Sequence, residues 1–200
     1  MTAGLRRRHA LFGVTTYPPG SYFEQVVDLY TGKILFVVDV SGSMEGRRLA
    51  EARVGALKLL TTAVRMGYVA GVIHFAGAAR LALAPTTDLK RIERTIKNLE
   101  VEWTGTNLSK GIALGHDRLR SLRGDRVLAL FTDGETNRRS AIRAAEAARA
   151  DGIRVICEFG GTADPRLMKA LADSDGWSDR RAARDGDVAA RIGALVKELR

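Results

Sequence analysis

From Lys33 onward, the sequence alternates between short apolar runs and longer segments with helical periodicity. Each apolar run is rich in Val, Ile, Leu or Phe and is nearly continuous in hydrophobicity, which is typical of parallel strands covered on both faces. We predict such strands at 33–38, 69–75, 126–131 and 153–157. Strands that alternate with helices predict an open, doubly wound α/β sheet with right-handed crossovers and helices on both faces.

The segments between the apolar runs have the pattern of amphipathic helices. In 47–66, apolar residues recur at three- and four-residue steps, and the charged residues fall mostly on the other face. Comparable segments predict helices at 47–66, 88–99, 108–122, 138–151, 164–174 and 186–199. Residues 175–186 are polar, and we interpret them as a loop with room for one short last strand.

One short strand departs from the parallel pattern. Residues 80–84 alternate in character and end before Pro85. They follow the strand at 69–75 after only a few residues, whereas a parallel crossover needs about a dozen or more. We therefore predict an antiparallel hairpin here, and a mostly parallel sheet with one antiparallel edge strand.

Residues 1–32 differ from the rest of the chain. They contain Pro18-Pro19-Gly20 and most of the tyrosines, and they show no clear period. We interpret 1–32 as an N-terminal extension or arm. Residues 33–200 then have the size of one domain.

Bulk composition argues against several classes of protein. No apolar run reaches membrane-spanning length, and no long apolar stretch follows the N-terminal arginines, so we expect a cytoplasmic protein without a membrane partner. Cys157 is the only cysteine, which excludes an intrachain disulfide and argues against a Cys-based zinc site. The net charge of +9 comes from residues scattered over many segments without interleaved aromatic side chains. We therefore favour solvated helix faces over a nucleic-acid surface.

Oxygen-bearing side chains follow two of the predicted strands. Asp39-Val40-Ser41-Gly42-Ser43 comes directly after the first strand, and Thr132-Asp133-Gly134-Glu135 follows the third. In doubly wound sheets, ligands bind outside the carboxyl ends of the strands, and a divalent cation removes the repulsion between two nearby carboxylates. Thr106, on the Gly-containing loop that opens the helix at 108–122, is a third hydroxyl donor. We predict a site for Mg²⁺ (or Mn²⁺ or Ca²⁺), with the aspartates binding directly or through water. Its ligands are Asp39, Ser41, Ser43, Thr106 and Asp133.

The order, spacing and context of these residues resemble the von Willebrand factor A domain family. The match comprises Asp39-x-Ser41-x-Ser43, Thr106 in Thr104-Gly105-Thr106-Asn107, and Asp133 in Thr132-Asp133-Gly134, and it extends over about residues 33–199. The resemblance implies an intact metal-ion-dependent adhesion site, in which an Asp or Glu of a protein partner often completes the coordination. It also implies a non-enzymatic interaction module of a larger complex, for example one with an AAA+ ATPase, a kinase or a phosphatase.

Other interpretations of the same residues stay open. A Mg²⁺-dependent hydrolase or phosphatase could use Asp39, but haloacid dehalogenase-type chemistry usually wants a second carboxylate two residues later, where this chain has Ser41. Asp39 could instead cap the helix that follows, and nucleic acid could bind the basic surface. Phosphate-loop NTPase chemistry is disfavoured because the chain has no Gly-x-x-x-x-Gly-Lys-Ser/Thr motif. We interpret His74, inside a predicted strand, as a structural histidine.

Overall fold

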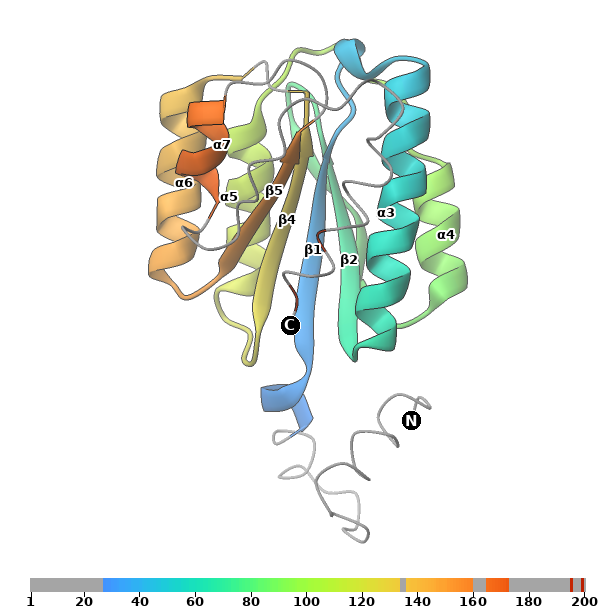
Figure 1. The fold of residues 1–200 in the computed structure, drawn as a ribbon, viewed down its shortest axis with the longest axis vertical. Coiled ribbons are helices and arrows are strands. Elements are labelled where there is room, and N and C mark those ends of the chain that lie inside the picture. The colour runs from blue at the N-terminus through green and yellow to red at the C-terminus, as the bar shows by residue number, and fades with distance from the viewer. Residues whose placement is uncertain (1–26, 134–135, 160–164, 173–194, 196–198, 200) are drawn as a thin grey trace, which may run out of the picture.

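The computed structural model of the chain describes residues 27–133, 136–159 and 165–172, together with Leu195 and Leu199. Within these residues, five strands form one sheet in the order β3-β2-β1-β4-β5 (Figure 1). The strands are β1 (Gly32–Asp39), β2 (Tyr68–Phe75), β3 (Ala79–Thr86), β4 (Arg126–Thr132) and β5 (Arg154–Phe159). The sheet confirms the predicted doubly wound, mostly parallel α/β class.

Strand β1 lies at the centre of the sheet. It pairs in parallel with both β2 and β4, so that Val38 lies beside His74 on one side and Phe131 on the other. Every residue of β1 is buried. A strand with parallel neighbours on both sides and helices over both faces has no solvated face, which explains its continuous apolar sequence.

The predicted hairpin between β2 and β3 is confirmed, but its predicted end at Pro85 was wrong. Strand β3 pairs antiparallel with β2 and continues through Pro85 to Thr86, which lies opposite Ala70. Proline is tolerated on an edge strand because the missing N–H can face away from the neighbouring strand. Two register shifts around Val72 accommodate the longer pairing.

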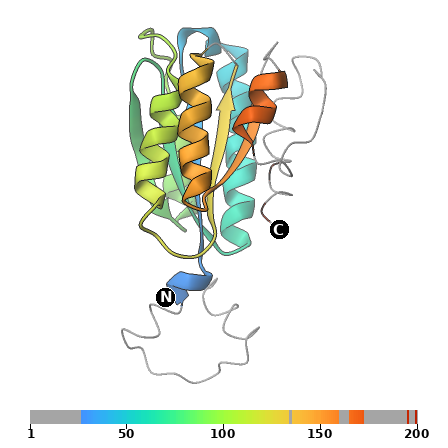
Figure 2. The ribbon, with the colours of Figure 1, turned by 90° about the vertical axis from the view of Figure 1, so that its left-hand side faces the viewer.

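Two helical layers cover the sheet. Residues Ile34, Phe36 and Val38 of β1 pack in one core cluster with α3 and α4, whereas Leu35 and Val37 pack in a second cluster with α5, α6 and α7. Figures 1 and 2 show these helices on opposite faces of the sheet. The helices are α3 (Arg47–Arg65), α4 (Leu89–Lys97), α5 (Leu108–Leu119), α6 (Arg138–Ala150) and α7 (Pro165–Leu171).

A capping group explains where helix α4 begins. Helix α4 begins one residue later than predicted, because the Asp88 side chain accepts hydrogen bonds from the N–H groups of Lys90 and Arg91 and so acts as the N-cap. Helix α5 ends at Leu119 and not at 122. The helix predicted at 186–199 and the polar loop at 175–186 lie almost entirely outside the described residues.

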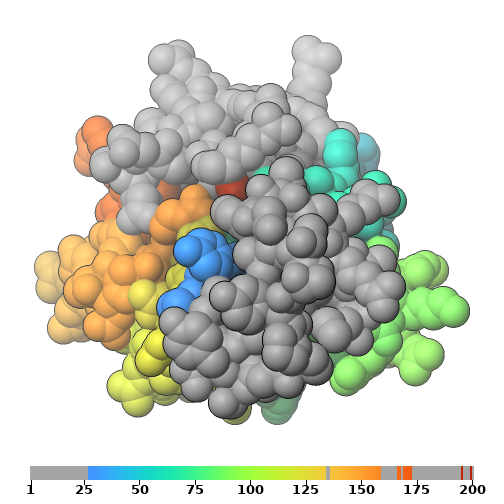
Figure 3. All heavy atoms as spheres, turned by 90° about the horizontal axis from the view of Figure 1, so that it is seen from below, coloured from blue at the N-terminus to red at the C-terminus, as the bar shows by residue number. Residues whose placement is uncertain are grey.

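At the lower end of the sheet in Figure 1, hydrogen bonds link the segment before β1 to the turn before β4. The Lys33 ammonium donates to the carbonyl oxygens of Asp28 (2.6 Å) and Arg123 (2.7 Å). Figure 3 views the molecule from this end and shows the segment before β1, in blue, beside the turn before β4, in yellow. Residues 1–26 lie outside the described part, so the predicted arm stays a prediction. None of the described helices is long and apolar enough to cross a membrane.

Candidate metal site at the carboxyl ends of β1 and β4

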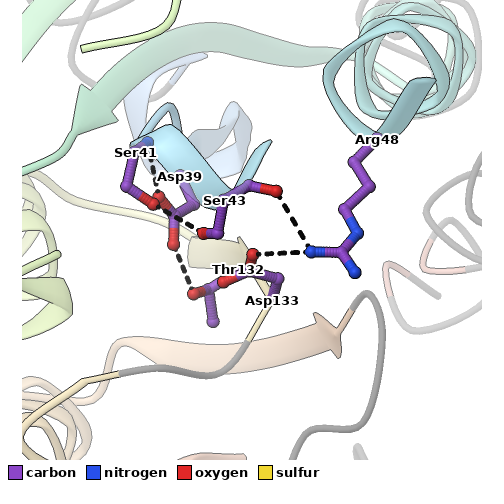
Figure 4. Close-up of polar contacts among 6 residues, drawn as sticks. All are labelled: Asp39, Ser41, Ser43, Arg48, Thr132 and Asp133. Atoms are coloured by element: carbon purple, nitrogen blue, oxygen red, sulfur yellow. Dashed lines mark hydrogen bonds and ion pairs between the residues drawn. The ribbon is translucent and has the colours of Figure 1, made fainter. Parts of the chain in front are cut away.

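The sheet order brings the two predicted aspartate loops together. Because β1 and β4 are parallel neighbours, their carboxyl ends lie at the same edge of the sheet. Figure 4 shows Asp39, Ser41, Ser43 and Asp133 gathered at this edge. Asp39 is fully buried, and the side chain of Asp133 is only 4% exposed. Two carboxylates this inaccessible to water need compensating donors or a cation.

The Asp39 carboxylate is held by donors from both loops. Its Oδ1 accepts a hydrogen bond from the Ser41 N–H at 2.8 Å, and its Oδ2 accepts one from the Thr132 hydroxyl at 2.6 Å. Burial raises the pKa of the Asp39 carboxyl above its ordinary value, the bonds from Ser41 and Thr132 oppose this rise, and the charge of Asp133 adds to it. A nearby cation would favour the ionised form and offset the cost of burial.

The two serine hydroxyls lie next to this carboxylate. The Oγ atoms of Ser41 and Ser43 are 3.1 Å apart. They flank the start of the short 3₁₀ turn η1 (Gly42–Met44), in which the Met44 N–H donates to the Ser41 carbonyl at 2.9 Å. The Met44 side chain is fully buried and anchors the turn in the core. The turn thus presents two hydroxyl oxygens side by side.

Asp133 provides a carboxylate oxygen without a partner. Its Oδ1 is buried and has no hydrogen-bond partner among the residues that the structure describes. Its Oδ2 lies 3.4 Å from Nη1 of Arg48, which also donates to the Ser43 carbonyl at 3.1 Å (Figure 4). A buried carboxylate oxygen without a donor costs free energy. A bound cation is one way in which such an oxygen is satisfied.

Thr106 lies on a loop that hydrogen bonds fix to the rest of the site. The Glu102 N–H donates to the Val40 carbonyl (2.7 Å) at one end of this loop, and the Asn107 N–H donates to the Ala76 carbonyl (2.7 Å) at the other. The Leu108 N–H donates to the Thr136 hydroxyl (3.2 Å), beyond Asp133. Thr106 is half-buried and makes no hydrogen bond to the other four predicted ligands in the described part of the chain. Its place as a ligand therefore stays a prediction.

The donor set fits a small, hard divalent cation. All four gathered side chains offer oxygen, which Mg²⁺, Mn²⁺ and Ca²⁺ prefer, and one of the carboxylate oxygens is buried without a donor. Among the described residues, no group of three or more His, Cys, Asp or Glu side chains is placed to hold a metal. A cation here would therefore depend on hydroxyl oxygens as well as on two carboxylates.

Sequence reasoning did not assign a role to two residues of this site. Thr132 donates to Asp39, and Arg48 contacts Asp133. Thr132 precedes Asp133 at the end of a strand, so a prediction that β1 and β4 are neighbours could have placed its hydroxyl near Asp39. Arg48 had no comparable signal, because it is one of several arginines on a helix that begins beside the site.

One other predicted role, that of His74, can be compared with the structure, which also shows Trp103 near the site. His74 is half-buried near the carboxyl end of β2, and its Nε2 lies 3.3 Å from Glu102 Oε1. These surroundings agree with a structural histidine. Trp103 is 72% exposed, and its ring packs over Gly42, between the two serines. The aromatic ring therefore lies on the rim of the candidate site.

Comparison of the sequence with known proteins identifies one protein family. A model of the von Willebrand factor type A domain matches residues 34–135. The inter-alpha-trypsin inhibitor heavy chain H3 of Rattus norvegicus is 26% identical over an alignment of 184 residues, and the match covers 83% of this chain and 21% of that protein. The heavy chain H3 of Mus musculus is 28% identical over an alignment of 116 residues, and the match covers 52% of this chain and 13% of that protein. This chain therefore spans about a fifth or less of the length of these relatives.

Solved structures with a similar fold have low sequence identity. The von Willebrand factor domain of the type V pili tip protein Mfa5 from Porphyromonas gingivalis has a TM-score of 0.72 at 13% identity, and the match covers 86% of this chain and 95% of that one. A von Willebrand factor type A protein from Catenulispora acidiphila has a TM-score of 0.69 at 18% identity, with 85% and 43% covered. The pilus adhesin SpaC from Lactobacillus rhamnosus GG has a TM-score of 0.69 at 16% identity, with 86% and 30% covered. At these identities the likeness shows the fold alone.

Proposed function

The chain belongs to the von Willebrand factor type A domain family, and from this premise we propose that it is a protein-interaction module with a divalent-cation site, for Mg²⁺ by preference. One observation carries the proposal: Oδ1 of Asp133 is buried and has no donor in the described part of the chain, and it lies beside a second carboxylate and two hydroxyls. The residues that would hold the cation are Asp39, Ser41, Ser43, Thr106 and Asp133.

The charge balance of the site supports an acidic protein partner. The two aspartates carry two negative charges, which a divalent cation would only just neutralise, and Arg48 adds a positive charge at the rim. When bound, the cation supplies a Lewis-acidic contact for an oxygen ligand from outside. The residues of this chain hold and orient that contact, and the partner would present an Asp or Glu side chain.

The names of relatives are compatible with this function. The structural relatives include a pilus tip protein and a pilus adhesin. We extend from them only the general role of an interaction module. Our further proposal, a cytoplasmic complex with an AAA+ ATPase, a kinase or a phosphatase, rests on the family resemblance.

Two observations favour this module over a hydrolase that uses Asp39. The Asp39 side chain is fully buried, and both of its carboxylate oxygens already accept hydrogen bonds. A nucleophilic carboxylate must reach the substrate, and its reaction needs an acid for the leaving group. Position 41, where that acid would stand, is Ser41.

The first test measures binding of the cation itself. We expect isothermal titration of the purified chain with Mn²⁺ to show one site, and Asp133→Asn to weaken binding by about a hundredfold, since it removes one of two charges on the ion. Asp117→Asn is the matched control, because Asp117 is an exposed residue of α5 that pairs with the exposed Arg120. If the unmodified chain does not bind Mn²⁺ or Mg²⁺ at millimolar concentration, the proposal fails.

The second test concerns the partner. The chain is immobilised and exposed to native extract in Mg²⁺, and bound protein is eluted with EDTA. We expect a protein that the Asp133→Asn chain does not retain. Retention that is equal in Mg²⁺ and in EDTA would contradict a metal-bridged contact.

A further inference from the structure

Two adjacent arginines at the start of α3 have different partners. Arg47 is 69% exposed, and its Nε lies 2.6 Å from Oε1 of Glu51, one turn further along the same helix. Arg48 reaches the other way, to the candidate metal site (Figure 4). Arg47 therefore forms an ordinary ion pair on the helix surface, whereas Arg48 belongs to the candidate site.

The Arg48 guanidinium lies at the mouth of the site. Its Nη1 is shared between the Ser43 carbonyl (3.1 Å) and Oδ2 of Asp133 (3.4 Å). The Arg48 side chain is 47% exposed, whereas that of Asp133 is 4% exposed. The contact is long and open to solvent on the arginine side, so it is a weak ion pair that can be displaced.

The Arg48 guanidinium contacts the same carboxylate that the metal ion would use. Arg48 contacts Oδ2 of Asp133, whereas the other oxygen, Oδ1, is buried and accepts no hydrogen bond from any described residue. A divalent cation bound through Oδ1 would share one carboxylate with the guanidinium. Two cations on one carboxylate repel each other, and each weakens the attraction of the carboxylate for the other.

We propose that Arg48 is a built-in counter-ion that competes with the divalent cation for Asp133. In the metal-free protein, the guanidinium neutralises part of the charge of the two aspartates and so stabilises the fold. In the metal-bound protein, the same charge opposes the ion and lowers the affinity of the site. This inference rests on the proposed function, because it concerns the same site.

Mn²⁺ titration of three variants tests the competition. Arg48→Gln removes the charge and keeps a donor, and we expect its Kd for Mn²⁺ to fall about tenfold, which corresponds to about 1.4 kcal/mol. Arg48→Lys keeps the charge and is expected to bind within about threefold of the unmodified chain. Arg47→Gln, the matched control, is expected to leave the Kd unchanged. The gain in Arg48→Gln shrinks in high salt, because the guanidinium is half exposed and screened.

Thermal unfolding provides a readout that does not depend on the titration. In EDTA, Arg48→Gln is expected to have a lower Tm than the unmodified chain, and saturating Mn²⁺ is expected to close or reverse that difference, because a ligand stabilises the state that it binds more tightly. Arg47→Gln has the same Tm shift on metal addition as the unmodified chain.

The outcomes separate this inference from the proposed function. An unchanged or weaker Mn²⁺ affinity in Arg48→Gln, with the unmodified chain still binding Mn²⁺, overturns the competition and leaves the metal site standing. Absence of Mn²⁺ binding in the unmodified chain overturns both. A tenfold gain restricted to Arg48→Gln supports both.

Discussion

Thr132 Oγ1 lies 2.6 Å from Asp39 Oδ2, and this hydrogen bond joins the carboxyl ends of the neighbouring strands β4 and β1. It is fully buried. Together with the N–H of Ser41, it leaves neither oxygen of the Asp39 carboxylate without a donor. The bond therefore fixes the direction of Asp39 before any cation arrives.

Thr132→Val is expected to destabilise the metal-free protein by about 1–3 kcal/mol, since it keeps the shape of the side chain but leaves a buried carboxylate oxygen without its donor. Urea unfolding in EDTA measures the free energy. Thr62→Val is the matched control, because the Thr62 hydroxyl donates to the Lys58 carbonyl on the exposed side of α3. Equal free energies of unfolding for the two variants would show that the Asp39 contact contributes nothing.

Thr106→Val is expected to weaken Mn²⁺ binding by about tenfold or more while it leaves the fold intact. Within the described residues, Thr106 forms no hydrogen bond to the other four predicted ligands, so we expect the main effect of losing its hydroxyl to be on the metal. Thr106→Ser keeps the hydroxyl and is expected to bind like the unmodified chain. Titration with Mn²⁺ measures both. Equal affinities for the Val and Ser variants would remove Thr106 from the ligand set.

Gly111→Ala is expected to destabilise the protein by about 1–3 kcal/mol, although alanine is the better helix former. A Cβ at this position of α5 would lie 2.8 Å from Val37 Cγ1 and 3.0 Å from Phe75 Cδ1. Chemical denaturation measures the loss. Ala113→Gly, at an exposed position of the same helix, reports helix propensity alone and is expected to cost about 1 kcal/mol. A stabilised Gly111→Ala protein would mean that α5 does not pack this closely on the sheet.

Stability is expected to fall as the pH drops below about 6.5, in part because of His74. Burial lowers the pKa of His74 below its ordinary value of 6.5, Glu102 opposes this shift, and Arg80 adds to it. The folded protein therefore resists a proton that the unfolded chain accepts, so stability is lost from pH 6.5 down to the folded pKa. Over this range the unfolded chain binds more protons than the folded protein, so the free energy of unfolding falls as the pH falls.

His74→Gln removes this contribution, and the difference between the variant and the unmodified chain isolates it from the other histidines. We expect the free energy of unfolding to fall less in His74→Gln than in the unmodified chain between pH 7.5 and 5.5. Parallel pH profiles for the two proteins would contradict the lowered pKa.

Local sequence patterns were sufficient to predict the sheet and most of its bounds. The strands are continuous apolar runs because both faces are covered, and the helices follow a three- to four-residue period. The end of β3 was missed at Pro85 because the rule that proline ends a strand does not hold at an edge. The short connection after β2 predicted an edge strand, but how far the pairing continues depends on the register with β2 and not on the residues of β3 alone.

The sequence by itself determined which chemical groups the site contains: two carboxylates and neighbouring hydroxyls, each placed directly after a strand or at the start of a helix. Only the tertiary structure decided how they meet. Thr132 and Asp39 are 93 residues apart, and Arg48 and Asp133 are 85 apart. Contacts over such separations follow from strand order and helix placement, which depend on packing of the complete core. For the same reason, the contact of Arg48 with Oδ2 of Asp133, and the absence of a donor to Oδ1 among the described residues, became visible only in the folded chain.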